Sequence, residues 1–282
     1  MNQIIYKDEE KNAIRFSKIT KIEAEMPFTG LGIKYVDEGE ETYYANNKKF
    51  TIKKGEYIIG NNFTSSIVEI NQKQPVQGLC IDISTEIISE VADYHDISGS
   101  DIKEFLLSNQ LFINRYNIKN TNLGGLLVEL NNNVKSGNYQ NDILKDHLFY
   151  SLAESIIEDQ RFIYDHLNKM NFKKVKTNED VFRTILLAKS FIDDHVMDNF
   201  SLDQISLQAG ISKYHFIRVF KNTFGISPYQ YQKHKRLEKA KIELARGRSV
   251  SDIAILFGYP DLPTFSKAFK QAFGQFPSHF SK

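Results

Sequence analysis

Residues 249–277 read SVSDIAILFGYPDLPTFSKAFKQAFGQFP, and residues 201–228 read SLDQISLQAGISKYHFIRVFKNTFGISP. The two stretches align with one inserted residue, and a repeat of this kind decides the architecture of the part of the chain that contains it. The identical pairs are Ser201/Ser249, Ile205/Ile253, Gly210/Gly258, Phe216/Phe265, Phe220/Phe269, Lys221/Lys270, Phe224/Phe273, Gly225/Gly274 and Pro228/Pro277. The C-terminal part of the chain therefore contains one structural unit twice.

Each copy has the pattern of two short helices joined by a tight turn. Ser201 stands at an N-cap position, directly before apolar residues at helical spacing. Ser212 is a second N-cap candidate and opens a helix over residues 213–224, which Gly225 ends because glycine adopts positive φ without a steric penalty. This is the pattern of a helix-turn-helix. A small helical bundle with a solvated charged face is the alternative, and the duplication of the same glycine and phenylalanine positions disfavours it.

Residues about 178–282 resemble the DNA-binding domain of the AraC/XylS family of bacterial transcription regulators. In the second copy, SDIAILFGY followed by FSKAFKQAFGQFPSHF is close to the signature of that family. The resemblance implies two helix-turn-helix units joined by a long helix, here from Pro228 to about Gly247. It also implies double-stranded DNA as the partner, and RNA polymerase as a protein that such a regulator can contact.

The first residues of each recognition helix are the candidates for reading bases, because these residues meet base edges in the major groove. In the first copy they are Lys213, Tyr214, His215, Ile217 and Arg218, and in the second copy they are Leu262, Pro263, Thr264 and Lys267. Tyr214, His215 and Arg218 occupy positions that resemble contact positions in the family. Arg218 suits bidentate recognition of guanine, whereas His215 could equally form a hydrogen bond within its own domain.

The second copy departs from the pattern of the family, which usually has polar residues at these positions. The side chains of Leu262 and Pro263 cannot form hydrogen bonds with base edges. We therefore predict that the second unit grips the DNA backbone and thymine methyl groups more than it reads sequence. The half-site under the first unit should carry most of the specificity.

Positive charge is concentrated at the C-terminal end of the chain. Residues 213–282 contain 13 Lys and Arg against 4 Asp and Glu, a formal charge of +9, whereas the whole chain carries +1 and residues 1–212 therefore carry −8. This asymmetry is typical of nucleic-acid binding. Phosphate-contact candidates are Lys221, Lys233, Lys235, Arg236 and Lys270, with helix N-termini at Ser201 and Ser249. For any single lysine, a solvated helix face is an equally good interpretation.

The first half of the chain changes from β structure to helices. Strands are expected near 14–24, 31–38, 41–45, 49–52, 56–60, 66–70 and 76–83, a spacing that indicates a sandwich or barrel. The run YVDEGEETYYANNKKFTIKKGEYIIGNN resembles the cupin-like jelly-roll sensor domain of AraC-type regulators. Helices are expected near 84–94, 100–108, 121–136 and 141–169. The last has an amphipathic stripe that serves either packing against the β domain or formation of a homodimer.

We therefore predict a two-domain α+β chain. Residues 1–170 form a β jelly-roll (cupin-like) sensor and dimerisation domain with trailing helices, and residues 171–178 form a linker. Residues 179–282 form an all-α domain of two helix-turn-helix units joined by a long helix, whose first helix spans about 179–196.

The resemblance implies a small-molecule effector inside the jelly roll. Strand parity suggests that the pocket is lined by Ile33, Tyr35, Tyr43, Tyr57, Ile59 and Ile81, with Arg15 either pairing an anionic ligand or lying on the surface. Two alternatives remain open. The N-terminal domain could serve only for dimerisation or protein contact, or it could be a cupin-type enzyme fused to a DNA-binding domain.

Composition narrows the alternatives further. No histidine precedes His95, so the imidazole ligands of a metal-dependent cupin are missing, and we expect no enzyme, no metal and no cofactor. The single cysteine, Cys80, rules out an internal disulfide. There is no charged-then-apolar segment at the N-terminus and no apolar run of about 18 residues. We therefore expect neither export nor membrane spanning, and a cytoplasmic protein.

Overall fold

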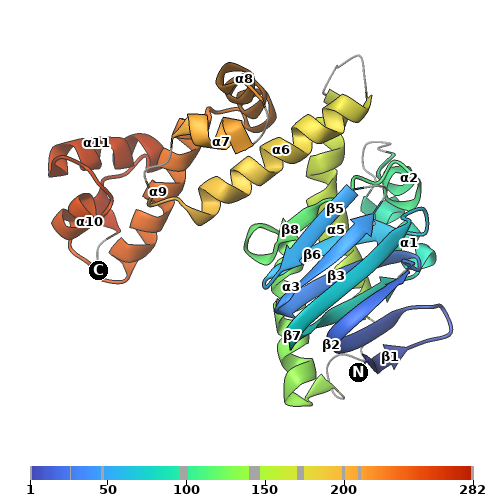
Figure 1. Ribbon diagram of the computed structural model, residues 1–282. Coiled ribbons are helices and arrows are strands. Elements are labelled where there is room, and N and C mark those ends of the chain that lie inside the picture. The colour runs from blue at the N-terminus through green and yellow to red at the C-terminus, as the bar shows by residue number, and fades with distance from the viewer. Residues whose placement is uncertain are drawn as a thin grey trace. The chain divides into compact units, whose positions relative to one another are not determined.

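The computed structural model describes residues 2–25, 27–45, 48–95, 101–139, 147–169, 175–198, 201–208 and 211–280. The chain divides into two compact units, Met1–Lys173 and Lys174–Lys282. The first is an antiparallel β-sheet domain with helices, and the described part of the second is all helical (Figure 1). This confirms the predicted fold class of a β domain with trailing helices followed by an all-α domain.

The sheet has the strand order β1-β2-β7-β3-β6-β8, and the β4–β5 hairpin pairs with β7. The strands are β1 (Asn2–Lys7), β2 (Ala13–Glu25), β3 (Leu31–Glu38), β4 (Glu40–Ala45), β5 (Lys48–Lys53), β6 (Glu56–Asn61), β7 (Ser66–Ile83) and β8 (Arg115–Asn117). The two strands predicted over 66–70 and 76–83 are one long strand, β7. Strands β1 and β8 were not predicted.

Strand β7 connects the two parts of the sheet because it is long enough to pair with different strands along its length. Its first residues pair with β4, its last residues pair with β3, and its register with β2 shifts between Ile19 and Lys21. A buried apolar cluster, here called the sheet interior, joins these parts. It consists of Phe28, Val36, Tyr43, Ala45, Phe50, Ile52, Ile58, Val68, Ile70, Val76 and Ile113.

Helices cover the opposite face of β3, β6 and β7, and α3 lies behind these strands in Figure 1. They are α1 (Thr85–His95), α2 (Ile102–Leu107), α3 (Asn122–Ser136) and α5 (His147–Lys169). Tyr57 of β6 stacks on Tyr116 at 5.4 Å between ring centroids, and the hydroxyl of Tyr116 donates to Gln160 of α5 at 3.4 Å. The apolar stripe of α5 is largely buried within this unit, Leu152 and Ile156 completely. Most of the described stripe therefore packs within this unit, whereas Phe162 of the same stripe is 39% exposed. A homodimer through this region stays a prediction.

The second unit consists of α6 (Val175–Asp194), α7 (Leu202–Gln208), α8 (Lys213–Phe224), α9 (Pro228–Ala245), α10 (Val250–Leu256), α11 (Leu262–Phe273) and the short helix η2 (Pro277–His279). Helix α6 begins earlier than predicted, so residues 175–178 of the predicted linker are helical. No glycine or proline stands in 171–178 to stop a helix. Residues 171–174 of the predicted linker and Gly210 of the repeat lie outside the described residues.

The two copies of the repeat have the same dimensions, with a first helix of 7 residues and a second helix of 12. Gly225 and Gly274 end the second helices with φ of +77° and +74°, and each donates its N–H to a lysine carbonyl at 2.8 Å. Such left-handed backbone favours glycine because a Cβ would be strained there. The sequence repeat is therefore a structural repeat.

Three phenylalanines hold each second helix against its unit, and we call each set a phenylalanine ladder. In α8, ring centroids are 5.7 Å apart for Phe216 and Phe220, and 4.5 Å apart for Phe220 and Phe224. In α11, the corresponding distances are 5.6 Å for Phe265–Phe269 and 4.7 Å for Phe269–Phe273. The first two rings of each ladder are fully buried. Residues four apart lie on one side of a helix, so the ladder fixes which face of α8 or α11 is exposed.

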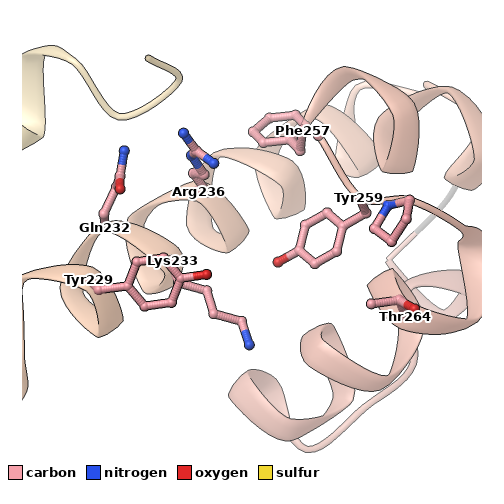
Figure 2. A pocket seen from close by; sticks show the side chains of 9 residues that line it. Tyr229, Gln232, Lys233, Arg236, Phe257, Tyr259 and Thr264 are labelled. Atoms are coloured by element: carbon pink, nitrogen blue, oxygen red, sulfur yellow. The ribbon is translucent and has the colours of Figure 1, made fainter. Parts of the chain in front are cut away.

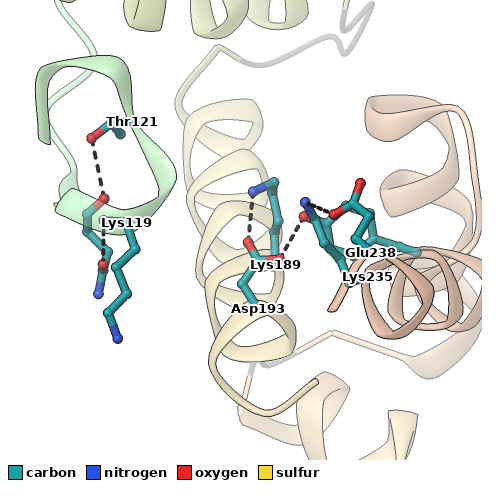
Figure 3. Close-up of polar contacts among 8 residues, drawn as sticks. Lys119, Thr121, Lys189, Asp193, Lys235 and Glu238 are labelled. Atoms are coloured by element: carbon teal, nitrogen blue, oxygen red, sulfur yellow. Dashed lines mark hydrogen bonds and ion pairs between the residues drawn. The ribbon is translucent and has the colours of Figure 1, made fainter. Parts of the chain in front are cut away.

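A polar contact joins α6 to α9, as Figure 3 shows in part. Asp193 of α6 accepts hydrogen bonds from Lys189 at 2.9 Å and from the hydroxyl of Tyr231 in α9 at 2.7 Å. The Tyr231 ring in turn contacts Phe220 edge-on at 5.7 Å between centroids. Tyr231 therefore connects α6, α9 and the first phenylalanine ladder.

We expect Tyr231→Phe to lower the free energy of unfolding of the second unit by about 1–3 kcal/mol, because it leaves a largely buried carboxylate oxygen without its donor. Chemical denaturation followed by circular dichroism measures this change. Tyr229→Phe is the matched control, since Tyr229 lies on the same helix and is exposed. Equal stability of the two variants would contradict the assignment.

Candidate nucleic-acid interface

Helix α8 exposes the predicted base-reading residues of the first unit. Lys213, Tyr214 and Arg218 are exposed, and Tyr214 keeps 78% of its surface accessible. Ile217 is half-buried. Lys213 forms an ion pair with Asp203 at 2.8 Å, which holds its ammonium group near α7. Tyr214 and Arg218 are therefore the large side chains most available to a major groove.

His215 is half-buried, and its Nε2 atom is buried without a hydrogen-bond partner among the described residues. The backbone N–H of His215 donates to the hydroxyl oxygen of Ser212, the N-cap residue of α8, at 3.3 Å. The alternative of a hydrogen bond within the domain is thus not realised at Nε2. A role at the DNA surface would require this ring to turn outward.

Helix α11 exposes a different set of side chains. Leu262, Pro263, Thr264 and Lys267 are all exposed. Asp261 caps the helix by accepting the N–H of Thr264 at 2.6 Å, and these hydrogen bonds lower the pKa of Asp261. At the positions that correspond to Lys213, Tyr214 and Arg218 of α8, α11 therefore exposes Leu262, Pro263 and Lys267.

Among the residues that the structure describes, some of the predicted phosphate-contact residues are free of acidic partners, and others already have a partner within the protein. Lys221, Lys233 and Lys270 are exposed and have no acidic partner among the described residues, although Lys270 lies 4.3 Å from the ring centroid of Phe276. Lys235 forms an ion pair with Glu238 at 2.8 Å. Ser201 and Ser249 use their hydroxyl oxygens as N-caps, at 3.2 and 3.1 Å.

The prediction that Arg236 contacts a phosphate has a competing explanation, because Arg236 has hydrogen-bond partners inside the domain. Its guanidinium donates to the carbonyl of Val196 at 2.6 Å and to that of Asp198 at 2.9 Å. Two nitrogens of the Arg236 guanidinium therefore satisfy carbonyls just after α6, and a direct phosphate contact stays a prediction.

The predicted effector pocket needs a correction, because its residues lie on two faces of the sheet. Ile33, Tyr35, Tyr57, Ile59 and Ile81 stand directly opposite one another across β3, β6 and β7, and directly opposite residues share one face. That face is covered by helices. Tyr43 belongs to the sheet interior instead. The reason for the error is that β3 is buried on both faces, so its sequence does not alternate and cannot indicate parity.

The pairing places a group of polar residues on the interior face of the sheet. Arg15 pairs with Cys80, and Cys80 with Lys34, so all three share this face. Lys34 is only 3% exposed and has no acidic partner within hydrogen-bonding distance among the described residues. Arg15 forms an ion pair with Asp82, whose other oxygen, Oδ1, is buried without a partner in the described structure. Arg15 is thus neither a plain surface residue nor free for a ligand.

Glu41 and Tyr43 of β4 complete this interior polar group, which we define as Arg15, Lys34, Glu41, Tyr43 and Asp82. The hydroxyl of Tyr43 donates to Glu41 at 2.9 Å. Burial raises the pKa of Glu41 to about 7, against the opposing effects of the Tyr43 hydrogen bond and the charge of Lys34. A buried carboxyl and a buried ammonium group so placed are costly unless they interact with polar groups.

No group of three or more His, Cys, Asp or Glu side chains among the described residues is arranged to hold a metal ion. No helix in the same residues has the length and apolar character needed to cross a bilayer.

Comparison with known proteins agrees with this geometry. A family model described as a helix-turn-helix domain matches residues 205–282. The probable transcriptional regulator LumQ of Photobacterium leiognathi is 31% identical over 140 residues, which cover 49% of this chain and 54% of that protein. The raffinose operon transcriptional regulatory protein RafR of Pediococcus pentosaceus is 27% identical over 252 residues, 89% of this chain and 84% of that protein. The chain thus spans about half the length of LumQ and most of RafR.

Among solved structures, ToxT of Vibrio cholerae aligns over 98% of both chains with a TM-score of 0.42 and 10% identity.

The second unit is a double helix-turn-helix DNA-binding domain, and the chain is a DNA-binding transcription regulator. Residues 205–282 match the helix-turn-helix model, and most of the chain is similar to a bacterial transcription regulator, in agreement with the resemblance to the AraC/XylS family. The relatives named above are transcription regulators and not enzymes, in agreement with the prediction.

We expect the stability of the first unit to depend on pH through Glu41. Its pKa is about 7 in the folded protein against an ordinary value of 4.5, so the folded state binds the proton more tightly. Glu41 therefore favours folding at low pH, and this contribution is lost as the pH rises from about 4.5 to about 7. Glu41→Gln cannot ionise and should become more stable than the wild type over this range, by up to about 3 kcal/mol.

Differential scanning calorimetry of both proteins between pH 5 and 8 measures this difference. Parallel pH curves for the wild type and Glu41→Gln would show that the carboxyl does not titrate in the sheet interior.

Proposed function

We propose that this regulator reads DNA sequence mainly through α8 and holds the backbone mainly through α11. The observation that carries the proposal is the contrast between two helices of equal length and equal ladder geometry. Lys213, Tyr214 and Arg218 are exposed on α8, and Leu262, Pro263 and Lys267 stand at the corresponding exposed positions on α11. Because the scaffold is the same, the difference in side chains decides what each helix recognises.

In the first unit, the Arg218 guanidinium is exposed on the second turn of α8. A guanidinium there can donate two hydrogen bonds to the O6 and N7 atoms of one guanine. Tyr214, one turn earlier, can contact a neighbouring base or a phosphate. Lys221, at the end of the same helix, can reach only the backbone, which positions the protein without reading sequence.

In the second unit, Leu262, Pro263 and the methyl group of Thr264 suit the 5-methyl group of thymine, and Lys270 suits phosphate oxygens. Lys267, which corresponds to Arg218, offers a single ammonium group to a base or a phosphate instead of a planar guanidinium. Apolar contacts of this kind discriminate weakly between bases. The half-site under α11 should therefore tolerate base changes better than the half-site under α8.

Arg218→Ala should weaken binding to the preferred site by about 5- to 150-fold and remove the preference for guanine at one position, because a bidentate contact is worth about 1–3 kcal/mol. Lys221→Ala should weaken binding to all sequences alike. It should also reduce the slope of log K against the logarithm of the salt concentration by about one. Fluorescence anisotropy with duplexes that differ at single positions measures both effects. An unchanged base preference in Arg218→Ala would refute the assignment of this side chain.

We further propose that a small-molecule effector binds in the first unit, at the interior polar group. Asp82 Oδ1 is buried there without a hydrogen-bond partner among the described residues, and a polar ligand would satisfy it. Lys34 is 3% exposed, and its ammonium group lies over the Phe28 ring at 5.4 Å from the centroid, so a ligand could also offer it an acceptor. Such a ligand must bind two arrangements of the protein with different affinity in order to change DNA occupancy.

A regulator without an effector is the second candidate, and one observation favours it. Phe28 fills the sheet interior beside Gly32 and Gly60 so closely that an added Cβ on either would lie 2.5 Å from its ring. One end of the interior is thus occupied by the chain itself. The N-terminal domain would then act through a homodimer or through another protein such as RNA polymerase.

Native mass spectrometry of the purified chain and thermal shift with a metabolite panel separate these candidates. We expect at least one compound to raise the melting temperature of the wild type and of Lys21→Met, an exposed control on β2, but not of Lys34→Met. If no compound acts, or if Lys34→Met responds like the wild type, the effector site is not the interior polar group.

A further inference from the structure

A pocket of about 270 Å³ lies between α9 and the turn that precedes α11, both in the second unit. Tyr229, Lys233 and Arg236 line it from α9, and Tyr259 and Thr264 line it from the turn and from the first turn of α11. Figure 2 shows the hydroxyl of Tyr259 and the ammonium group of Lys233 pointing into the same space. The pocket is therefore shared by the long helix and the second helix-turn-helix.

The chemistry of the lining favours an anion. Two positively charged side chains and two phenol hydroxyls line the pocket, and no acidic residue does. Lys233 is exposed and has no acidic partner among the described residues, so its charge is available to a ligand. Arg236 is held by the carbonyls of Val196 and Asp198 and contributes its charge from a fixed position.

The Tyr259 hydroxyl is held in place as a hydrogen-bond donor. Its ring meets Phe265 of α11 edge-on, at 5.2 Å between centroids and 66° between planes. Burial raises the pKa of Tyr259, so its hydroxyl stays protonated at neutral pH. Because packing already fixes the Tyr259 ring, hydrogen bonding to a ligand costs little further side-chain entropy.

We propose that this pocket is a seat for one phosphate group of the DNA backbone, bound by Lys233, Tyr259 and Tyr229. The proposal rests on the proposed function, because it assumes that α11 docks on DNA. Thr264, on the first turn of α11, borders both the pocket and the exposed face of the helix, so a phosphate here flanks the base pairs beneath α11.

The seat is a property of the second unit only. Ile211 stands in the first copy where Tyr259 stands in the second, so the first copy lacks the hydroxyl. The unit with few hydrogen-bonding groups toward the bases thus has an additional group toward the backbone. The phosphate seat would explain how α11 holds DNA without reading it.

The test uses the full chain and fluorescent duplexes that contain its preferred site. Tyr259→Phe and Lys233→Gln should each weaken binding about 3- to 10-fold, the size of one hydrogen bond, with base preference unchanged. Lys233→Gln should also reduce the salt dependence by about one counterion. Lys239→Gln is the matched control, because Lys239 is also exposed on α9 but lies about 240° around the helix from Lys233. This variant should bind DNA with an affinity within about twofold of the wild type.

A single uncharged methylphosphonate, moved along the backbone, identifies the phosphate. We expect one position near the α11 half-site to weaken wild-type binding and to cause no further loss in Lys233→Gln. Additive losses at every position would overturn the proposal, as would wild-type affinity in Lys233→Gln and Tyr259→Phe. Tight binding of inorganic phosphate, with unchanged DNA affinity in the variants, would also overturn it, because the seat would then serve a free anion. If the wild type binds no preferred sequence at all, the proposed function itself fails.

Discussion

The phenylalanine ladders are the contacts on which the geometry of the DNA-binding unit depends. In each recognition helix, rings at i, i+4 and i+8 pack together, and the first two are fully buried. A helix whose buried face is fixed in this way can expose only the residues between the rings. Ring distances agree within about 0.2 Å between the two copies. The two exposed faces are therefore set equivalently, and the two helices differ only in the side chains that they expose.

This separation of scaffold and surface explains how a duplicated unit can acquire two tasks. Substitutions on the exposed face leave the ladder, the serine or aspartate N-cap and the glycine C-cap intact, so they carry little cost in stability. The first copy exposes Tyr214 and Arg218 on this face, and the second exposes Pro263 and Lys267 at the corresponding positions. The second copy also has Tyr259 beside the long helix α9, where Lys233 and a fixed Arg236 supply positive charge. In the function that we propose, sequence reading and backbone binding fall to different copies.

The sequence predicted the features that depend on local spacing. The bounds of α8, the serine caps and the long helix from Pro228 follow from residues within a few positions of one another, and the structure agrees with them. Contacts between distant parts of the chain could not be predicted in this way. Arg236 resembles a surface arginine in sequence, and only the fold brings it to carbonyls some 40 residues earlier.

The β domain shows more clearly that contacts between distant parts of the chain cannot be predicted from local sequence. Most strands were predicted, because turn residues separate them, but β8 has only 3 residues and no periodicity to detect. Strand β3 is buried on both faces, so the sequence could not tell which of Lys34 and Tyr35 faces the sheet interior. The predicted pocket therefore combined two faces, and the interior polar group around Lys34 and Glu41 emerged only from the strand pairing.

The central claim is that one recognition helix reads sequence and the other mainly holds the backbone. Selection of bound duplexes from a random library, followed by sequencing, tests it most directly. We expect one half-site with strongly defined base pairs, including a guanine, and a second half-site, in the neighbouring major groove, with only a weak preference for thymine. Two half-sites defined equally well would contradict it.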